Sequence, residues 1–247
     1  MRSALFGTHA EAVASRPGMA LQNSKMLKAT LDGELIARQG TMVAYQGDVD
    51  FRALGAGGIA RYVQQRLTGE GVPLMSVTGR GEVFLADLAS EVFLVDLEGP
   101  GDALTINGRN VLAFEPSLRW DIQLVHGAGV LSAGLFNCVF TGRGRVAVTC
   151  SGTPLVLAVD QVTYADPQAA VCWSAGLRTG FHRADQLGLG TLLGRTTGEA
   201  YTMSFAGQGF VVVQAAEDIA VDLLGGAGIG EPAGGGIDEV LGGLLRG

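Results

Sequence analysis

The sequence predicts a mainly β protein, with stacked antiparallel sheets built from three internal repeats of about sixty residues. Two observations predict this class. Apolar, β-branched runs bounded by Gly, Asn or Asp recur along most of the chain, as in short strands joined by tight turns. An aromatic motif and a Gly-x-Gly motif then return three times in the same order. One or two short helices complete the predicted fold.

The composition is that of a chain with a large apolar core and few charges. Of the 247 residues, 47% are hydrophobic and 17% are charged, whereas a disordered chain is poorer in apolar residues and richer in charge. The formal net charge is −7. Because proteins that bind nucleic acid usually present a basic face, we expect a folded protein without a nucleic-acid partner.

Residues 1–19 are interpreted as an N-terminal arm. This stretch contains Arg2 but no continuous apolar segment, so it makes a poor signal peptide. No segment of the chain approaches the roughly 18 apolar residues of a transmembrane helix. Cys138, Cys150 and Cys172 form no CxxC pair and are interpreted as buried free thiols rather than a disulfide framework or zinc site. We therefore expect a cytoplasmic protein.

The aromatic motif begins each repeat. It reads MVAYQGDV, VLAFEPSL and AVCWSAGL, and its aromatic residues are Tyr45, Phe114 and Trp173. In every copy an aliphatic residue follows four positions later, and a Gly-rich link comes after the motif. Apolar residues that recur at matching positions of a repeat indicate a common core. These three aromatic residues are therefore the predicted repeat core.

A helix is predicted within residues 57–70, in the first link. Ile59, Val63 and Leu67 recur there at helical spacing, and Gly69 is placed where a helix commonly ends. The stretch is interpreted as a short surface helix that packs one apolar stripe against the sheets.

The Gly-x-Gly motif reads TGRGEVFL, TGRGRVAV and AGQGFVVV. A phosphate-binding loop would need GxxxxGK[ST] or a third glycine that opens a helix, and neither pattern is completed. Gln208 replaces Arg80 and Arg143 in the third copy, so the repeat does not require an arginine. Glycine accepts the positive φ of tight turns, which predicts a hairpin used three times. The predicted structural turns are Gly79, Gly81, Gly142, Gly144, Gly207 and Gly209.

The three units are predicted to share one core around a pseudo-threefold axis, because a single unit cannot bury both of its faces. This gives a single triplicated β domain over residues 20–222. A Gly-rich C-terminal tail follows at 223–247. Its last stretch, from Ile237 to Arg246, is interpreted either as a disordered end or as a short helix that docks on a neighbouring subunit.

No residue pattern indicates a reaction. His9, His126 and His182 are isolated in sequence, so a metal at His126 and His182 would require the repeats to bring them together. Cys150 and Ser151 have no base nearby in sequence, and no GxSxG motif occurs. We therefore expect no catalytic, cofactor or metal site.

Four segments of the chain resemble one known family. They read GTMVAYQGDVDF, LTGEGVPLMSVTGRGEVFLA, GLFNCVFTGRGRVAVTCSG and TTGEAYTMSFAGQGFVVVQ. The chain is similar, over about residues 20–216, to bacterial members of the mitochondrial biogenesis family named for altered inheritance of mitochondria. The resemblance implies a TRAP-like β fold, akin to the trp RNA-binding attenuation protein, and frequent homo-oligomers. It implies no catalytic residues, and RNA binding does not follow from a shared fold.

These observations lead to three hypotheses on function. The first is a non-enzymatic structural or interaction protein of unknown process that self-associates as a homo-oligomer. The alternative is a module that binds a small molecule or a lipid in the pseudo-threefold centre. A third is an enzyme with a metal at His126 and His182.

Overall fold

A computed structural model describes residues 12–54, 73–124, 136–183 and 201–215, and the structural statements below concern these residues. They are mainly β-strands paired in antiparallel fashion, which confirms the predicted fold class. The predicted helix at 57–70, most of the N-terminal arm and the tail at 223–247 lie outside the described residues. Among the described residues, no helix is long and apolar enough to cross a membrane.

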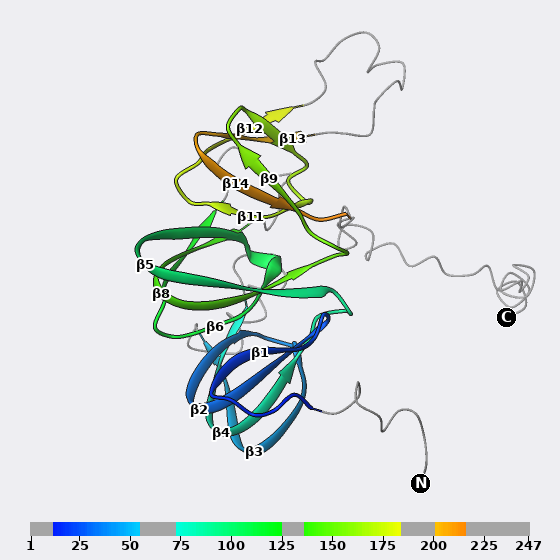
Figure 1. Cartoon of the computed structure of the whole chain (residues 1–247), viewed down its shortest axis with the longest axis vertical. Helices are drawn as coiled ribbons and strands as arrows, with labels where there is room; N and C mark the ends of the chain where they lie inside the picture. Colours follow the sequence, from blue (N-terminus) through cyan, green and yellow to red (C-terminus); the bar gives the residue numbers. More distant parts are fainter. Residues whose placement is uncertain (1–11, 55–72, 125–135, 184–200, 216–247) are drawn as a thin grey trace, which may run out of the picture. The chain divides into compact units, whose positions relative to one another are not determined.

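The strands fall into three consecutive segments of the chain, which can be followed by label in Figure 1. The first segment holds β1 (Gly18–Asn23), β2 (Met26–Arg38), β3 (Met42–Leu54) and β4 (Leu74–Leu85). The second holds β5 (Glu91–Asn107), the 3-10 helix η2 (Gly108–Asn110), β6 (Val111–Phe114), β7 (Arg119–Leu124) and β8 (Phe136–Cys150). The third holds β9 (Leu155–Val159), β10 (Thr163–Ala165), β11 (Ala170–Ser174), β12 (Arg178–Arg183), β13 (Tyr201–Ala206) and β14 (Gly209–Val213).

All three segments use one pairing scheme. In each, a leading strand and a middle strand both pair with the closing strand that comes last in the chain. In the first segment these are β2, β3 and β4. In the second they are β5, then β6 with β7, then β8. In the third each strand is split in two, so β14 pairs with β9 and β11, while β13 pairs with β10 and β12.

The leading strand of one segment pairs with the middle strand of the next. At the first junction β2 pairs with β6, and Ile36 lies opposite Phe114. At the second junction β5 pairs with β11, and Thr105 lies opposite Trp173. The resulting sheet follows the order β3-β4-β2-β6-β8-β5-β11-β14-β9, and β10-β13-β12 form a separate three-stranded sheet.

The core consists of several buried clusters, two of which contain residues from neighbouring segments. Separate buried clusters form around Leu27 and Leu85, around Phe140, and around Phe205. The sheet order is open, with β3 at one end and β9 at the other. The junctions join the segments in a row, and no described strand pairing supports the predicted pseudo-threefold arrangement, which stays a prediction. The internal triplication itself stays a prediction.

Two of the three residues of the predicted repeat core are buried. Phe114 is 0% exposed and Trp173 is 3% exposed, but Tyr45 is 48% exposed. The three residues still occupy one register, because each lies opposite the valine four positions after the first glycine of a Gly-x-Gly motif. Those valines are Val83, Val146 and Val211. Tyr45 differs because β6 and β11 are covered by a preceding segment, whereas β3 belongs to the first one.

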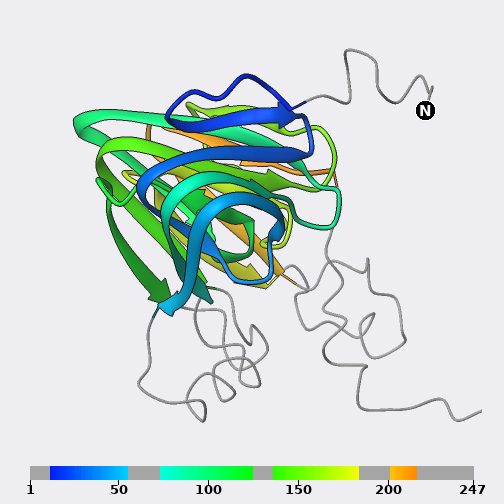
Figure 2. The ribbon, with the colours of Figure 1, turned by 90° about the horizontal axis from the view of Figure 1, so that it is seen from below.

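The predicted Gly-x-Gly hairpins are also corrected. Gly79 and Gly81 lie inside β4, which continues through them and stays paired with β2 and β3 along its length. Gly142 and Gly144 lie likewise inside β8. In the third copy the motif separates β13 from β14, and Gly209 begins β14. The glycines therefore bend the closing strand instead of reversing it, and Figure 2 shows the curved strands of the first segment.

Close approach of β3 explains why the bend needs glycine. Gly79 has a φ of +122°, which L side chains rarely adopt. A methyl group added at Gly79 or Gly81 would clash with the backbone carbonyl of Asp48 or Gln46 on the neighbouring strand.

Candidate functional site

The middle strand of the first segment presents an exposed apolar edge. β3 pairs with β4 on one side, and no other described strand pairs with its second side. Its first residues are all exposed, including Met42, Val43 and Tyr45. Successive residues of a strand point to opposite faces, so both faces of this stretch are uncovered. Residues 42–46 are termed the β3 edge.

The third segment presents a second edge of the same kind. β10 pairs with β13 but with no other described strand. Tyr164 on β10 is 59% exposed, and Val162 just before the strand is exposed as well. Residues 162–165 are termed the β10 edge. Neither edge contains a charged residue, although charged side chains are a usual means of keeping strand edges from pairing with other chains.

Tyr164 lies beside His182, the one histidine of the metal hypothesis that the structure describes. The ring centroids of Tyr164 and His182 are 5.9 Å apart, and Nε2 of His182 is 2.8 Å from Oγ of Ser204. His9 and His126 lie outside the described residues. Within the described ranges, no group of three or more His, Cys, Asp or Glu side chains could hold a metal ion. The pairing of His126 with His182 stays untested.

The three cysteines are buried free thiols, as predicted. Burial raises the pKa of Cys138 and of Cys172 to about 12 in each case. Burial also raises the pKa of Cys150 to about 11. A thiol is nucleophilic only as the thiolate, so these groups are protonated and unreactive at neutral pH.

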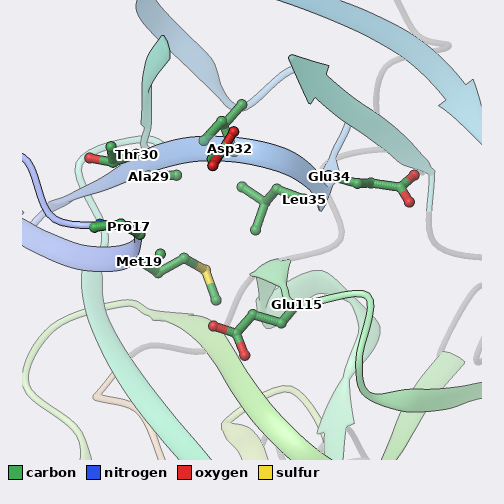
Figure 3. A pocket seen from close by; sticks show the side chains of 10 residues that line it. Pro17, Met19, Ala29, Thr30, Asp32, Glu34, Leu35 and Glu115 are labelled. Carbon is green, nitrogen blue, oxygen red and sulfur yellow. The ribbon is translucent and has the colours of Figure 1, made fainter. Parts of the chain in front are cut away.

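A small pocket lies between β1 and the bent part of β2. Figure 3 shows the side chains of Met19, Leu35 and Glu115 directed toward it. Its volume is about 160 Å³, whereas pockets for drug-sized ligands measure about 300–1,000 Å³. The pocket is therefore too small for a lipid or a drug-sized molecule.

The carboxylates that line this pocket already have hydrogen-bond partners. Glu34 accepts a hydrogen bond from the Ser76 hydroxyl at 2.5 Å. Glu115 accepts one from the backbone N–H of Arg145 at 3.0 Å. Asp32 accepts one from the guanidinium of a neighbouring arginine. These hydrogen bonds link β2 to β4 and link Glu115 to β8, and the three acids share no partner.

The arginines of the Gly-x-Gly motifs are bound to local oxygen atoms. Arg80 Nε lies 2.9 Å from Oδ1 of Asp32, and Arg143 donates to the Glu98 carbonyl at 2.9 Å. Arg145 binds Asp96 with two nitrogens, at 2.5 and 2.8 Å. The hydrogen bonds from Arg145 hold the pKa of Asp96 below its usual range. This local pairing lowers the positive charge that these arginines offer to a phosphate.

An ion pair between a buried lysine and a partly exposed glutamate anchors the residues before β1. Lys28 is 3% exposed, and its Nζ lies 2.9 Å from Glu82 on β4. The same ammonium group donates to the carbonyl of Val13 at 2.5 Å and to Ser15. Hydrogen bonds from Ser15 and from Lys28 keep the pKa of Glu82 below its usual range. The pair joins three parts of the first segment and has a structural role.

The model of the family described as mitochondrial biogenesis AIM24 matches residues 19–216. The chain belongs to the AIM24 family. The match extends from β1 to the end of β14, so both edges lie within the AIM24 region. No curated protein matches the sequence.

The AIM24 chain is also similar to a solved structure. This is an X-ray crystal structure of a protein from Streptococcus pyogenes, which is 18% identical and has a TM-score of 0.63. The similarity covers 85% of this AIM24 chain and 96% of the streptococcal chain. At this level of identity the likeness shows a shared fold alone.

Proposed function

We propose that this AIM24-family protein is a non-enzymatic structural or interaction protein that self-associates through the edges of its sheets. One observation carries the proposal. The β3 edge and the β10 edge are apolar, exposed and without a described strand on their outer side. An unpaired edge offers backbone N–H and C=O groups that can add a strand from another chain.

The chemistry of the described side chains supports a role without catalysis. The three thiols are buried and protonated, and the arginines beside the strand bends are bound to local oxygens. That pairing and the net charge of −7 also support the proposal that nucleic acid is not a partner. We further propose a cytoplasmic location, because free thiols fit a reducing compartment.

Binding of a small molecule or lipid has less support. That function needs a cavity large enough for the ligand, and the pocket of about 160 Å³ beside Met19 is well below the usual size. No observation of the described residues favours this alternative over self-association.

Sedimentation velocity over a series of protein concentrations tests the proposal. We expect the average mass to rise as the protein concentration is raised to about 1 mM. A dissociation constant of about 1 mM corresponds to a binding free energy of about 4 kcal/mol, so the series detects even weak association. Val43→Asp should lower the association, because it places a charge on the β3 edge. Leu88→Asp is the matched control, since Leu88 is 97% exposed in the turn between β4 and β5. A single monomeric species throughout the series would refute self-association.

A further inference from the structure

The two junctions within the chain share one register. One leading-strand residue at each junction faces the next segment on one side and the closing strand of its own segment on the other. Within its own segment, this residue lies opposite the closing-strand residue three positions before the first glycine of the Gly-x-Gly motif. Ile36 therefore lies opposite Ser76, and Thr105 lies opposite Val139. The same position of the third segment is occupied by Tyr164, which lies opposite Ser204.

The partners across the junctions also share one register. Ile36 contacts the middle strand of the next segment opposite Phe114, and Thr105 does so opposite Trp173. All four residues are buried. Phe114 and Trp173 occupy the middle-strand position that Tyr45 occupies in the first segment, because each lies opposite the matching valine of its closing strand.

One leading-strand position and one middle-strand position are therefore left without a described partner. Tyr164 at the end of the row is 59% exposed, and Tyr45 at its beginning is 48% exposed. Each is the exposed counterpart of residues that are buried at both junctions within the chain. The two edges are thus the two halves of one more junction of the same kind.

We propose that the β10 edge of one copy pairs with the β3 edge of a second copy in this antiparallel register, with Tyr164 of one copy opposite Tyr45 of the other. The register of the internal junctions also places Thr163 opposite Gln46 and Ala165 opposite Ala44. This inference rests on the proposed function, since it specifies how the chains associate.

The chemistry of the two edges fits this pairing. Directly opposite aromatic residues are a favourable cross-strand pair, and the neighbouring pairs are small or uncharged. Backbone groups on both edges gain partners that they lack within the described part of one chain. Because the two surfaces differ, the association is head-to-tail and continues into a ring or a filament.

The contact is short, so it forms a concentration-dependent equilibrium. Each internal junction pairs only two or three residues directly, and covalent linkage keeps its two strands at a high effective concentration. A junction between separate chains lacks that advantage. A covalent trap is therefore the appropriate measurement.

Disulfide trapping between two full-length variants tests the register. Residues directly opposite in antiparallel strands have Cα atoms about 4.5–5.5 Å apart, which suits a disulfide. Equal amounts of Tyr45→Cys and Tyr164→Cys protein are mixed, oxidised mildly and analysed by mass spectrometry. We expect the mixed dimer to exceed the homodimer of either variant by about tenfold. The three native thiols are buried and stay out of the reaction.

Leu88→Cys is the matched control, because it supplies an exposed thiol that belongs to neither edge. If Tyr164→Cys links to Leu88→Cys as well as it links to Tyr45→Cys, the register is overturned. Homodimers of Tyr45→Cys in excess would overturn the head-to-tail arrangement in favour of a symmetric one. A link within one chain that carries both substitutions, formed at high dilution, would overturn association between copies at these edges.

The sedimentation series separates the two proposals. If unmodified protein gains mass with concentration but no mixed dimer is trapped, self-association stands and the head-to-tail junction fails. If the unmodified protein stays monomeric and no mixed dimer is trapped, both proposals fail.

Discussion

Substitution of matching aromatic residues in two segments gives a direct test of the open row. Phe114 is 0% exposed and makes edge-to-face contacts with Phe140 and Trp120, at centroid distances of 4.9 and 5.5 Å. Truncation of such a residue to alanine costs about 3–5 kcal/mol, from lost burial and the cavity left behind. Tyr45 in the same register is 48% exposed, so Tyr45→Ala should cost only about 1 kcal/mol in the monomer.

The assay is urea-induced unfolding of Phe114→Ala, Tyr45→Ala and the unmodified protein, at a concentration low enough to keep the chains apart. Far-UV circular dichroism and tryptophan fluorescence must report one coincident transition for the free energies of unfolding to be compared. The expected difference between the variants is about 2–4 kcal/mol. Equal losses would mean that Tyr45 is buried within a single chain and would refute the open row. If Tyr45→Ala becomes more costly as protein concentration rises, its burial is coupled to association.

Three further predictions concern the bend, the ion pair and the charge. Gly81→Ala should destabilise the protein in urea, because its new methyl group would clash with the Gln46 carbonyl, whereas Gly101→Ala, which meets no atom within 4 Å, should be nearly neutral. The pKa of Glu82 is depressed in the folded state, so its contribution is present above the unfolded pKa and is lost as pH falls through the folded pKa. Glu82→Gln should therefore reduce the acid dependence of the melting temperature below pH 4.5, the usual value for this group, and an unchanged profile would contradict the assignment. Because each chain carries −7, raising the salt from about 0.01 to about 0.15 M should strengthen self-association by screening repulsion, whereas weaker association at high salt would indicate a contact driven by opposite charges.

The sequence was sufficient to predict the class of fold and the matching positions of the segments. Strand-length apolar runs and turn residues are local signals, and the aromatic positions that the repeats align occupy one register in the structure. Burial of the aromatic position was not predictable in the same way. It depends on whether another segment lies beside the strand, and no local pattern distinguishes Tyr45 from Phe114 in this respect.

The role of the Gly-x-Gly motifs required knowledge of the neighbouring strands. A glycine with positive φ suits a hairpin as well as a bend. The chain continues through Gly79 because β2 and β3 pair with β4 on both sides, and each carries a glycine of positive φ at the bend, Gly33 and Gly47. Those two glycines were visible in the sequence, but their register against β4 was not.

The β10 edge was missed for a similar reason. The leading strand of the third segment is split into β9 and β10 and carries no motif that matches the first two leading strands. Its position becomes visible only through the closing strand, since Ser204 lies three residues before Gly207 and pairs with Tyr164. That count could have been made from the sequence only if the pairing scheme had been known.

The residues at the two ends of the row are suited both to exposure in a single chain and to burial when a second copy pairs with it. Any row of segments joined by unlike strands leaves one leading strand and one middle strand unpaired, and repeat proteins commonly protect such ends with polar outer faces. Here the middle-strand end carries Tyr45 where the internal junctions carry Phe114 and Trp173, and the leading-strand end carries Tyr164 where they carry Ile36 and Thr105. Tyrosine combines a ring that packs across strands with a hydroxyl that water can satisfy. A chain with such ends exposes tyrosine hydroxyls to water when it is alone and still has apolar surface to bury when a second copy pairs with it.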